Sequence, residues 1–233
     1  MEENVLPKPR KSIYTCFIKR LLDISLSLFA IVILMPVYTI IAVLELFFHG
    51  SPVLYTVERP GKDEKLFKIY KFRSMTNERD ETGALLPEEK RLTRFGKFLR
   101  RTSLDEIPEF FCILKGDMSI IGPRPLLIEY LSLYSPRYKA RHSVRPGLAC
   151  VPMLGAPQKN TWTWRDQFEN DIYYVEHVSF LVDVKTVLSV ALYMLRRNEV
   201  RTDDTRIPFD GSNYDETGTK DKMAEERKPE CVI

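Results

Sequence analysis

Residues 21–48 form a long apolar run that contains only two charged side chains, Asp23 and Glu45. As a continuous helix this run would measure about 42 Å at 1.5 Å per residue, longer than the roughly 30 Å hydrocarbon core of a bilayer. It also exceeds the apolar stretch of a removable signal peptide, which covers about 7 to 15 residues. We therefore predict that residues 19–49 form a membrane helix that stays on the mature protein.

Two features indicate that this helix enters the membrane and returns to the same side. Pro36 lies in the middle of the run, where it removes a backbone hydrogen bond and clashes with the preceding turn, so we expect a kink. Basic residues flank both ends, and such flanks favour the cytoplasmic side. They are Lys8, Arg10, Lys11, Lys19 and Arg20 before the run, and Lys62, Lys65, Lys68, Lys71 and Arg73 after it. We predict a re-entrant, monotopic helix; a tilted spanning helix is the alternative, because proline is tolerated there.

The composition describes one domain with appended segments. The 35 basic and 32 acidic side chains leave a formal charge of +3, too small to indicate nucleic acid, and we expect none as a partner. The four cysteines include no C-x-x-C pair, which argues against a zinc knuckle or a disulfide framework and indicates a reducing compartment. We divide the chain into a basic segment (1–18), the membrane helix (19–49), a main domain (50–201) and a polar, loosely attached tail (202–233).

The main domain reads as α+β, mainly helical with a short β-hairpin. Two β-rich runs, VLYTVER and LFKIYKF, are separated by the turn-like PGKDE. A polar loop is expected over residues 77–89. Helices are expected at roughly 91–114 and 126–132, and residues 164–197 should be mostly helical.

Two of the helical stretches carry an apolar face beside basic residues. In RLTRFGKFLRR, Leu92, Phe95 and Leu99 recur at helical spacing, and VDVKTVLSVALYMLRR ends in a basic pair. Such helices can lie in the membrane interface. Each could equally turn its apolar face into a soluble core. Their shared basic character favours contact with lipid headgroups.

Two adjacent carboxylates, Asp105 and Glu106 in SLDEIPEF, follow Arg100 and Arg101 and precede an apolar run. A solvated helix face could hold such a pair, but the flanking residues do not look solvated. Ser103 and Glu106 also fit a helix capping box, and Asp105 would gain from the dipole at a helix start. Catalysis and helix capping both remain open for this pair.

Several cations stand in rigid or extended segments that could present them to an anion. GDMSIIGPRP places Asp117 and Arg124 in a turn with two prolines, a good mount for an anion-binding guanidinium. YKFRSM puts Lys71 and Arg73 on one side of a strand, and RHSVRPG adds Arg145 beside another turn. With the carboxylate pair and the membrane helix, these cations suggest a site for a phosphate-bearing lipid or nucleotide. The chain has no P-loop and no G-x-G-x-x-G, so the usual backbone cradles would not hold a nucleotide.

The segments KFRSM, RRTSLDEIPEF, GDMSIIGPRP and RHSVRPG follow one another in this order behind the basic-flanked apolar run. This arrangement closely resembles the bacterial sugar transferase family, the monotopic polyprenyl-phosphate phosphoglycosyl transferases. The similarity extends from about residue 19 to 200 and includes FENDIYYVEHVSFLVDVKTVL. The chain looks like the small form of the family, similar to members that begin N-linked protein glycosylation with diacetylbacillosamine.

The resemblance implies transfer of a sugar 1-phosphate from a UDP-sugar to undecaprenyl phosphate, with release of UMP. The reaction would need Mg²⁺ and take place at the cytoplasmic face of the bacterial inner membrane, among membrane lipids. Asp105 would be the nucleophile, form a covalent phosphosugar intermediate and contact the metal, with Glu106 as its partner. Lys71 and Arg124 match phosphate-contacting positions, and Pro36 matches the helix-breaking proline. The residues expected to bind substrate or phosphate are Lys71, Arg73, Arg100, Asp117, Arg124 and Arg145.

One stretch departs from the family pattern. After RPG many relatives have Ile-Thr-Gly-Trp and then Asn-Gly-Arg, whereas this chain reads LACVPMLGAPQKNTWTW, so we carry no pocket residues across it. Two other functions stay open: a non-catalytic membrane-bound scaffold of the same fold, and a glycosyltransferase that releases UDP. Neither the sugar nor the oligomeric state, a homodimer included, can be read from the sequence.

Overall fold

The computed structural model describes residues 6–150, 163–196 and 207–215. Within them the chain is mainly helical and has two small two-stranded sheets, which confirms the predicted α+β class. The helices are α1 (Lys19–Phe48), α2 (Glu88–Arg91), α3 (Arg94–Thr102), α4 (Glu109–Lys115), α5 (Pro136–Lys139), α6 (Trp164–His177) and α7 (Phe180–Arg196). The strands are β1 (Leu54–Pro60), β2 (Leu66–Phe72), β3 (Ser119–Ile121) and β4 (Gly147–Ala149). The shorter helical turns are η1 (Tyr14–Ile18), η2 (Lys62–Glu64), η3 (Leu104–Glu106), η4 (Ile128–Ser132) and η5 (Ala140–Ser143).

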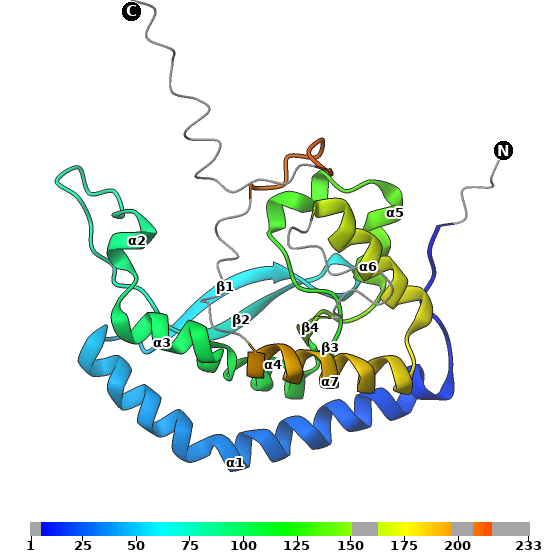
Figure 1. Ribbon diagram of the computed structural model, residues 1–233, viewed down its shortest axis with the longest axis horizontal. Helices are drawn as coiled ribbons and strands as arrows, with labels where there is room; N and C mark the ends of the chain where they lie inside the picture. The colour runs from blue at the N-terminus through cyan, green and yellow to red at the C-terminus, as the bar shows by residue number, and fades with distance from the viewer. Residues whose placement is uncertain (1–5, 151–162, 197–206, 216–233) are drawn as a thin grey trace, which may run out of the picture.

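Helix α1 runs along one side of the molecule and bends near its middle, so that both ends rise toward the other elements (Figure 1). Pro36 stands inside the helix, and its missing N–H and its clash with the preceding turn account for the bend. Helices α3, α4 and α7 lie on the concave side (Figure 1). The predicted kink is therefore present, and both ends of the helix face the same side.

The burial pattern of α1 is opposite to that of an amphipathic helix in a soluble protein. Its buried residues mostly follow an i, i+4 spacing and include three polar side chains: Asp23, Ser27, Ile31, Ile41 and Glu45. Its exposed large residues are apolar: Leu21, Leu26, Leu28, Phe29, Val32, Ile33, Met35, Ile40, Val43, Leu46, Phe47 and Phe48. Only 22% of the most apolar stretch of this helix is buried, whereas a helix in a protein core would be mostly buried. This surface suggests that α1 associates with lipid.

Polar contacts attach the start of α1 to the rest of the domain. One carboxylate oxygen of Asp23 accepts hydrogen bonds from Ser119 Oγ and from the backbone N–H of Ile120, both at 3.0 Å. Asp23 is only 3% exposed, so these bonds compensate part of the cost of burying its carboxylate.

A second set of contacts attaches the end of α1 to α3. Glu45 Oε2 lies 2.8 Å from His49 Nδ1, and His49 Nε2 lies 2.9 Å from Thr93 Oγ1. Thr93 is the N-cap of α3, where its hydroxyl accepts a hydrogen bond from Gly96 N. The end of the apolar helix is thereby held against the start of α3.

Arg73 belongs to the same junction, which corrects its predicted role in phosphate binding. Its guanidinium donates to three backbone carbonyls, those of His49, Gly50 and Pro52, at 3.0 to 3.3 Å. The residue is 7% exposed. These carbonyls lie directly after the end of α1. We therefore infer that Arg73 stabilises the segment that connects α1 to β1.

The predicted hairpin is confirmed. β1 pairs with β2 in antiparallel register, with Val57 opposite Ile69. Phe67 and Ile69 of β2 turn one face inward and form a buried cluster with Cys112 and Ile113 of α4 and with Met118.

The structure interrupts the single helix that was expected over residues 91–114. α3 ends at Ser103, which has left-handed backbone angles of φ 55° and ψ 21°. α4 begins only after Pro108, a residue that cannot donate a hydrogen bond to the preceding turn. Farther along, the helix expected over 126–132 is the 3-10 turn η4, whereas the helices expected over 164–197 are confirmed as α6 and α7.

The two amphipathic helices differ in what covers their apolar faces. In α3 the predicted apolar face packs inward: Leu99 is fully buried, and Phe95 stacks on Phe48 with ring centroids 5.0 Å apart. Phe98 remains 52% exposed on another side of this helix. α7 instead leaves a row of apolar side chains exposed: Phe180, Leu181, Val184, Val187, Leu188 and Leu192. The interfacial interpretation therefore suits α7 better than α3.

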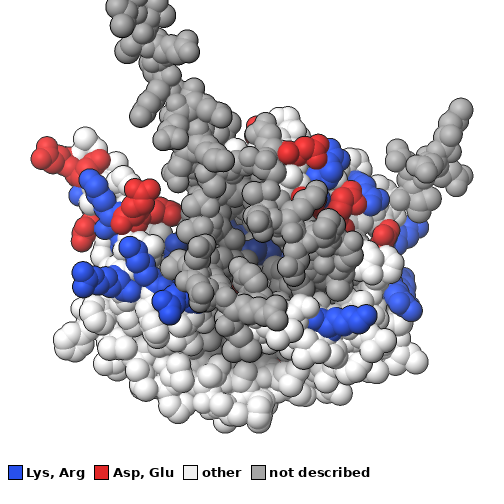
Figure 2. All heavy atoms as spheres, viewed as in Figure 1, with Lys and Arg blue, Asp and Glu red and all other residues white. Residues whose placement is uncertain are grey.

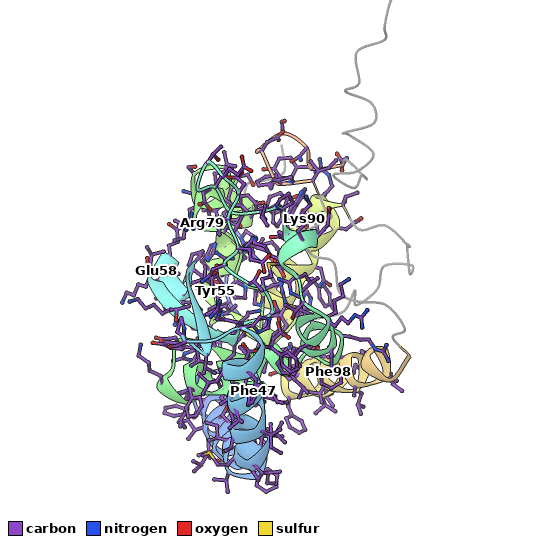
Figure 3. The ribbon with its side chains drawn as sticks, turned by 90° about the vertical axis from the view of Figure 1, so that its left-hand side faces the viewer. Phe47, Tyr55, Glu58, Arg79, Lys90 and Phe98 are labelled. Carbon is purple, nitrogen blue, oxygen red and sulfur yellow. The ribbon has the colours of Figure 1, made fainter. Side chains whose placement is uncertain are left out.

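The exposed apolar residues gather on one side of the molecule. Figure 2 shows the side formed by α1 almost free of charged residues, with lysines, arginines and acids above it. Phe47 and Phe98 lie toward this side in Figure 3, whereas Glu58, Arg79 and Lys90 lie away from it. An apolar surface bordered by charge is typical of a protein that lies in a membrane interface.

A cluster of aromatic rings forms a second core away from α1. Its buried members are Tyr130, Tyr134, Tyr138, Trp164, Phe168, Ile172 and Phe209. Phe209 is 3% exposed, and Ile207 O accepts a hydrogen bond from Trp164 Nε1 at 3.0 Å. The expectation of a loosely attached tail after residue 202 is therefore wrong for residues 207–215. The rest of the tail, residues 202–206 and 216–233, lies outside the described residues.

Phe209→Ala should lower the free energy of unfolding by about 3–5 kcal/mol, because it removes a ring from a closed aromatic cluster. Unfolding of the detergent-solubilised protein would measure the change. Leu85→Ala is the control, since Leu85 is 47% exposed, and we expect less than about 0.5 kcal/mol there. Equal small effects in both variants would show that residues 207–215 do not contribute to the core.

Candidate active site

Asp105 and Glu106 lie on the one-turn helix η3 between α3 and α4. Ser103 precedes them as the C-cap of α3, and its backbone N–H donates to Arg100 O. Its side chain makes no capping hydrogen bond to η3, so the capping box proposed for Ser103 and Glu106 is wrong. Because neither carboxylate is needed to cap a helix in this way, a chemical role becomes the stronger interpretation.

Lys71 of β2 contacts both η3 and α4, the two elements that follow α3. Its Nζ lies 2.8 Å from Glu106 Oε1 on η3 and 3.1 Å from Glu109 Oε1 on α4. Burial lowers the pKa of Lys71, but Glu106 and Glu109 outweigh burial and raise it. The ammonium therefore stays charged between the two carboxylates.

The Asp105 carboxyl is partly buried beside this group. Burial and the charge of Glu106 raise its pKa to about 6, although Lys71 and Arg100 act in the opposite direction. A carboxyl group with a raised pKa in such surroundings is a candidate for a functional residue. At neutral pH it is mostly ionised, and its charge is poorly solvated.

Arg100 reaches this turn from α3. Its Nε donates to Ser74 Oγ at 2.9 Å, just past the end of β2. α3 can approach this segment because residue 96 is glycine, where a Cβ would lie 1.8 Å from Ser74 O. The glycine therefore brings Arg100 near Asp105.

Arg124 faces the pair from the GPRP turn. Its Nη2 lies 3.6 Å from Glu106 Oε1, an ion-pair distance longer than a hydrogen bond. The turn is held from behind, because Arg141 donates to Arg124 O at 2.7 Å and pairs with Asp171 at the same distance. Arg141 and Asp171 are both buried, so breaking their ion pair would leave a buried charge.

Asp117 and Arg145 lie at the other end of α4, and the structure does not bring them to the dyad. Asp117 pairs with the exposed Lys115 at 2.9 Å, and Arg145 Nε donates to Gly116 O at 2.9 Å. Arg20 of α1 donates to Ile113 O and Leu114 O beside them. Cations beside these carbonyls stabilise the C-terminus of a helix. The position of Arg145 therefore fits capping of α4 better than phosphate binding.

Glu109 is a member of the cluster that the sequence analysis passed over. It is 4% exposed, and burial is the main cause that raises its pKa to about 7. The available signal in SLDEIPEF was a third carboxylate, Glu109, directly after Pro108 and close in sequence to the pair. The sequence did not show that Lys71 would lie between them.

α1 contacts the turn that carries Asp105 and Glu106 directly through Tyr38, two residues after Pro36. The Tyr38 hydroxyl donates to Ile107 O, the carbonyl directly after the dyad. The Tyr38 ring also meets Phe111 edge to face, with centroids 5.7 Å apart. Ile41 of α1 is buried against Ile107 as part of a cluster with Phe72 and Leu99. The bent helix therefore supports the turn that carries the carboxylates.

The carboxylates present are compatible with Mg²⁺. Within residues 6–150, 163–196 and 207–215, no group of three or more His, Cys, Asp or Glu side chains is arranged to hold a metal. Mg²⁺, however, is usually held by one or two carboxylates together with substrate phosphates and water. Asp105 and Glu106 fit that pattern.

The family of the chain follows from comparison with known proteins. Residues 14–197 match the family model described as bacterial sugar transferase. The matched segment covers α1, the dyad turn, the GPRP turn and all of α7. The protein belongs to the bacterial sugar transferase family.

Individual relatives agree with this assignment. The chain is 43% identical over 173 residues to the uncharacterized sugar transferase EpsL of Bacillus subtilis, covering 72% of this chain and 82% of that protein. It is 38% identical over 193 residues to the UDP-N-acetylgalactosamine-undecaprenyl-phosphate N-acetylgalactosaminephosphotransferase of Aeromonas hydrophila, covering 79% of this chain and 44% of that protein. It is 36% identical over 194 residues to the exopolysaccharide production protein PSS of Rhizobium leguminosarum, covering 78% of this chain and 97% of that protein.

Ser103→Gly should raise the free energy of unfolding by about 0.5–1 kcal/mol. Ser103 has a left-handed backbone conformation that glycine adopts without the steric cost of a Cβ. Ser103→Ala is the matched control, because it removes the same hydroxyl but keeps the Cβ and should give no gain. Thermal unfolding of the three proteins tests this, and a less stable glycine variant would contradict the conformation described for this turn.

Proposed function

We propose that the protein transfers a sugar 1-phosphate from a UDP-sugar to undecaprenyl phosphate and releases UMP. The names of characterised relatives support this reaction class. The structural observation that carries it is the Asp105–Glu106 pair, placed among three cations on a turn supported by an apolar helix. A diphosphate donor requires the cations, and a lipid acceptor requires the apolar surroundings.

In the first step, a carboxylate oxygen of Asp105 attacks the phosphorus atom that carries the sugar. The bond from this phosphorus to the bridging oxygen breaks, and UMP leaves with the electron pair. The product is a phosphosugar joined covalently to Asp105. The ionised form of Asp105 is the reactive one, and its partial burial leaves the attacking oxygen poorly solvated.

The surrounding cations act on the charge of the donor. A carboxylate that approaches a diphosphate meets a target of like charge, so the positive groups must lie close before the bond forms. Lys71 of β2 is held by Glu106, and Arg100 of α3 is held by Ser74. The backbone of Arg124 in the GPRP turn is held by Arg141. Mg²⁺ at Asp105 and Glu106 would add positive charge against the phosphates of the donor when it is bound.

In the second step, an oxygen of the undecaprenyl phosphate attacks the phosphorus of the phosphosugar. The bond to Asp105 breaks, the carboxylate is regenerated, and the lipid carries the sugar through a diphosphate. Glu106 keeps Lys71 beside the site during both steps. A two-step transfer lets one site handle a soluble donor and a membrane acceptor in turn.

We propose that the helix is re-entrant and that the protein lies on the cytoplasmic face of the inner membrane. The bend in α1 and its contacts to the domain at both ends support a single-sided position. Basic flanks at both ends favour the same side. Whether two copies associate stays open.

The sugar of the donor remains to be determined. The sequence resembles members that use diacetylbacillosamine, whereas the names of the relatives contain N-acetylgalactosamine, glucose and galactose. The stretch that departs from the family pattern, residues 148–164, lies mostly outside the described residues. A screen of these four UDP-sugars that scores UMP would identify the donor.

Asp105→Asn should abolish both UMP release and covalent labelling. Wild-type protein incubated with UDP-sugar and Mg²⁺ should gain the mass of one sugar phosphate, whereas the variant should lose at least about a thousandfold in rate. Asp215→Asn is the matched control, because Asp215 pairs with Arg165 on the surface. Equal turnover in Asp105→Asn would refute this nucleophile. Release of UDP would favour the glycosyltransferase, and no turnover of any donor would favour the scaffold.

The rate of covalent labelling should rise with pH through about 6 and level off above it. The sign follows from the raised pKa of Asp105: below about 6 the carboxyl is protonated and cannot attack, so the rate falls about tenfold per pH unit. Rapid quenching and mass spectrometry between pH 5 and 8 would measure it. Glu109 titrates close to this range, so the profile should also be recorded in Glu109→Gln. A rate that is constant from pH 5 to 7 in both proteins would contradict the raised pKa.

A further inference from the structure

Glu109 contacts Lys71 and is more deeply buried than either Lys71 or Glu106, so it is poorly placed to reach a substrate. The Glu109 side chain is 5% exposed, against 15% for Glu106 and 23% for Lys71. It stands at the first position of α4, directly after Pro108. The backbone of a new helix therefore fixes where its carboxylate points.

The ammonium of Lys71 has three N–H donors. Glu106 Oε1 accepts a hydrogen bond from one of them at 2.8 Å, and Glu109 Oε1 forms an ion pair with the ammonium at 3.1 Å. Among the residues that the structure describes, no third acceptor lies within hydrogen-bonding distance of this ammonium. Two carboxylates on two different elements, η3 and α4, therefore restrain the position of the ammonium.

A long, flexible lysine side chain does not hold one position without support. Glu106 alone would leave the ammonium free to rotate about one contact, whereas a second carboxylate from a different element defines its orientation. Glu109 also compensates the charge of Lys71 from a more deeply buried position. A buried acid in this position is costly unless it is paired, and the Lys71 pairing supplies the compensation.

We infer that Glu109 is a positioning residue, which holds Lys71 so that its remaining N–H faces the diphosphate of the donor. This inference rests on the proposed transfer from a UDP-sugar. It assigns Glu109 no contact with the substrate and no proton transfer. Its effect should therefore appear mainly in the affinity for the donor.

The test compares Glu109→Leu, which removes the carboxylate, with Glu109→Gln, which keeps an acceptor oxygen for Lys71. Glu109→Leu should raise the KM for the UDP-sugar about tenfold, as expected for loss of an oriented charged hydrogen bond, while kcat changes less than about threefold. Glu109→Gln should recover most of this loss. Glu169→Gln is the matched control, because Glu169 pairs with Arg137 on the surface and should behave as wild type.

Binding of UDP with Mg²⁺ to the same proteins, followed by calorimetry, gives a readout that does not require turnover. Weaker binding in Glu109→Leu with a wild-type value in Glu169→Gln would support the inference even if no donor sugar has been found. If wild-type protein released no UMP from any donor, the proposed function would fail separately. An unchanged KM and unchanged UDP binding in Glu109→Leu, or equal losses in the Leu and Gln variants, would overturn the positioning role.

Discussion

A helix that is polar on its covered face and apolar on its open face is stable only where lipid replaces water around it. α1 has this arrangement, and the position of the active site depends on it. Its buried polar residues hold β3 at one end and α3 at the other. Between them, Tyr38 supports the turn that carries Asp105 and Glu106. The carboxylates are therefore supported by the same helix whose exposed apolar face suggests membrane association.

The opposite side of the site is held by a different kind of support. The GPRP turn rests on the buried Arg141–Asp171 pair, which in turn lies against the aromatic core that residues 207–215 complete. The dyad thus lies between two supports, the apolar helix α1 and the aromatic core. A site at such a boundary can receive one substrate from water and the other from the bilayer.

The charges at the dyad are balanced pair by pair. Lys71 lies between two glutamates, Arg124 faces Glu106, and Arg100 acts on Asp105. This arrangement keeps Asp105 ionised near neutral pH although its surroundings are poorly hydrated. The apolar residues that follow the pair have a structural role: Ile107, Cys112 and Ile113 are buried in the core.

Local patterns in the chain were sufficient for the apolar helix, its proline bend, the hairpin, α6 and α7, because these depend on periodicity and on residues close in sequence. Motif order was sufficient for the family, whereas the role of Asp105 and Glu106 stays a prediction. The break between α3 and α4 was missed, since Ser103 takes a backbone conformation that its residue type seldom favours.

Only the tertiary structure divided the predicted phosphate-binding residues into two groups. Lys71, Arg100 and Arg124 gather at the dyad. Arg73 and Arg145 donate to backbone carbonyls, and Asp117 pairs with a surface lysine. Equivalent charges look alike along a sequence, and their roles differ only through the groups that packing brings within a few ångströms. The role of Glu109 could not be predicted for the same reason, because its partner Lys71 lies on a strand distant in sequence.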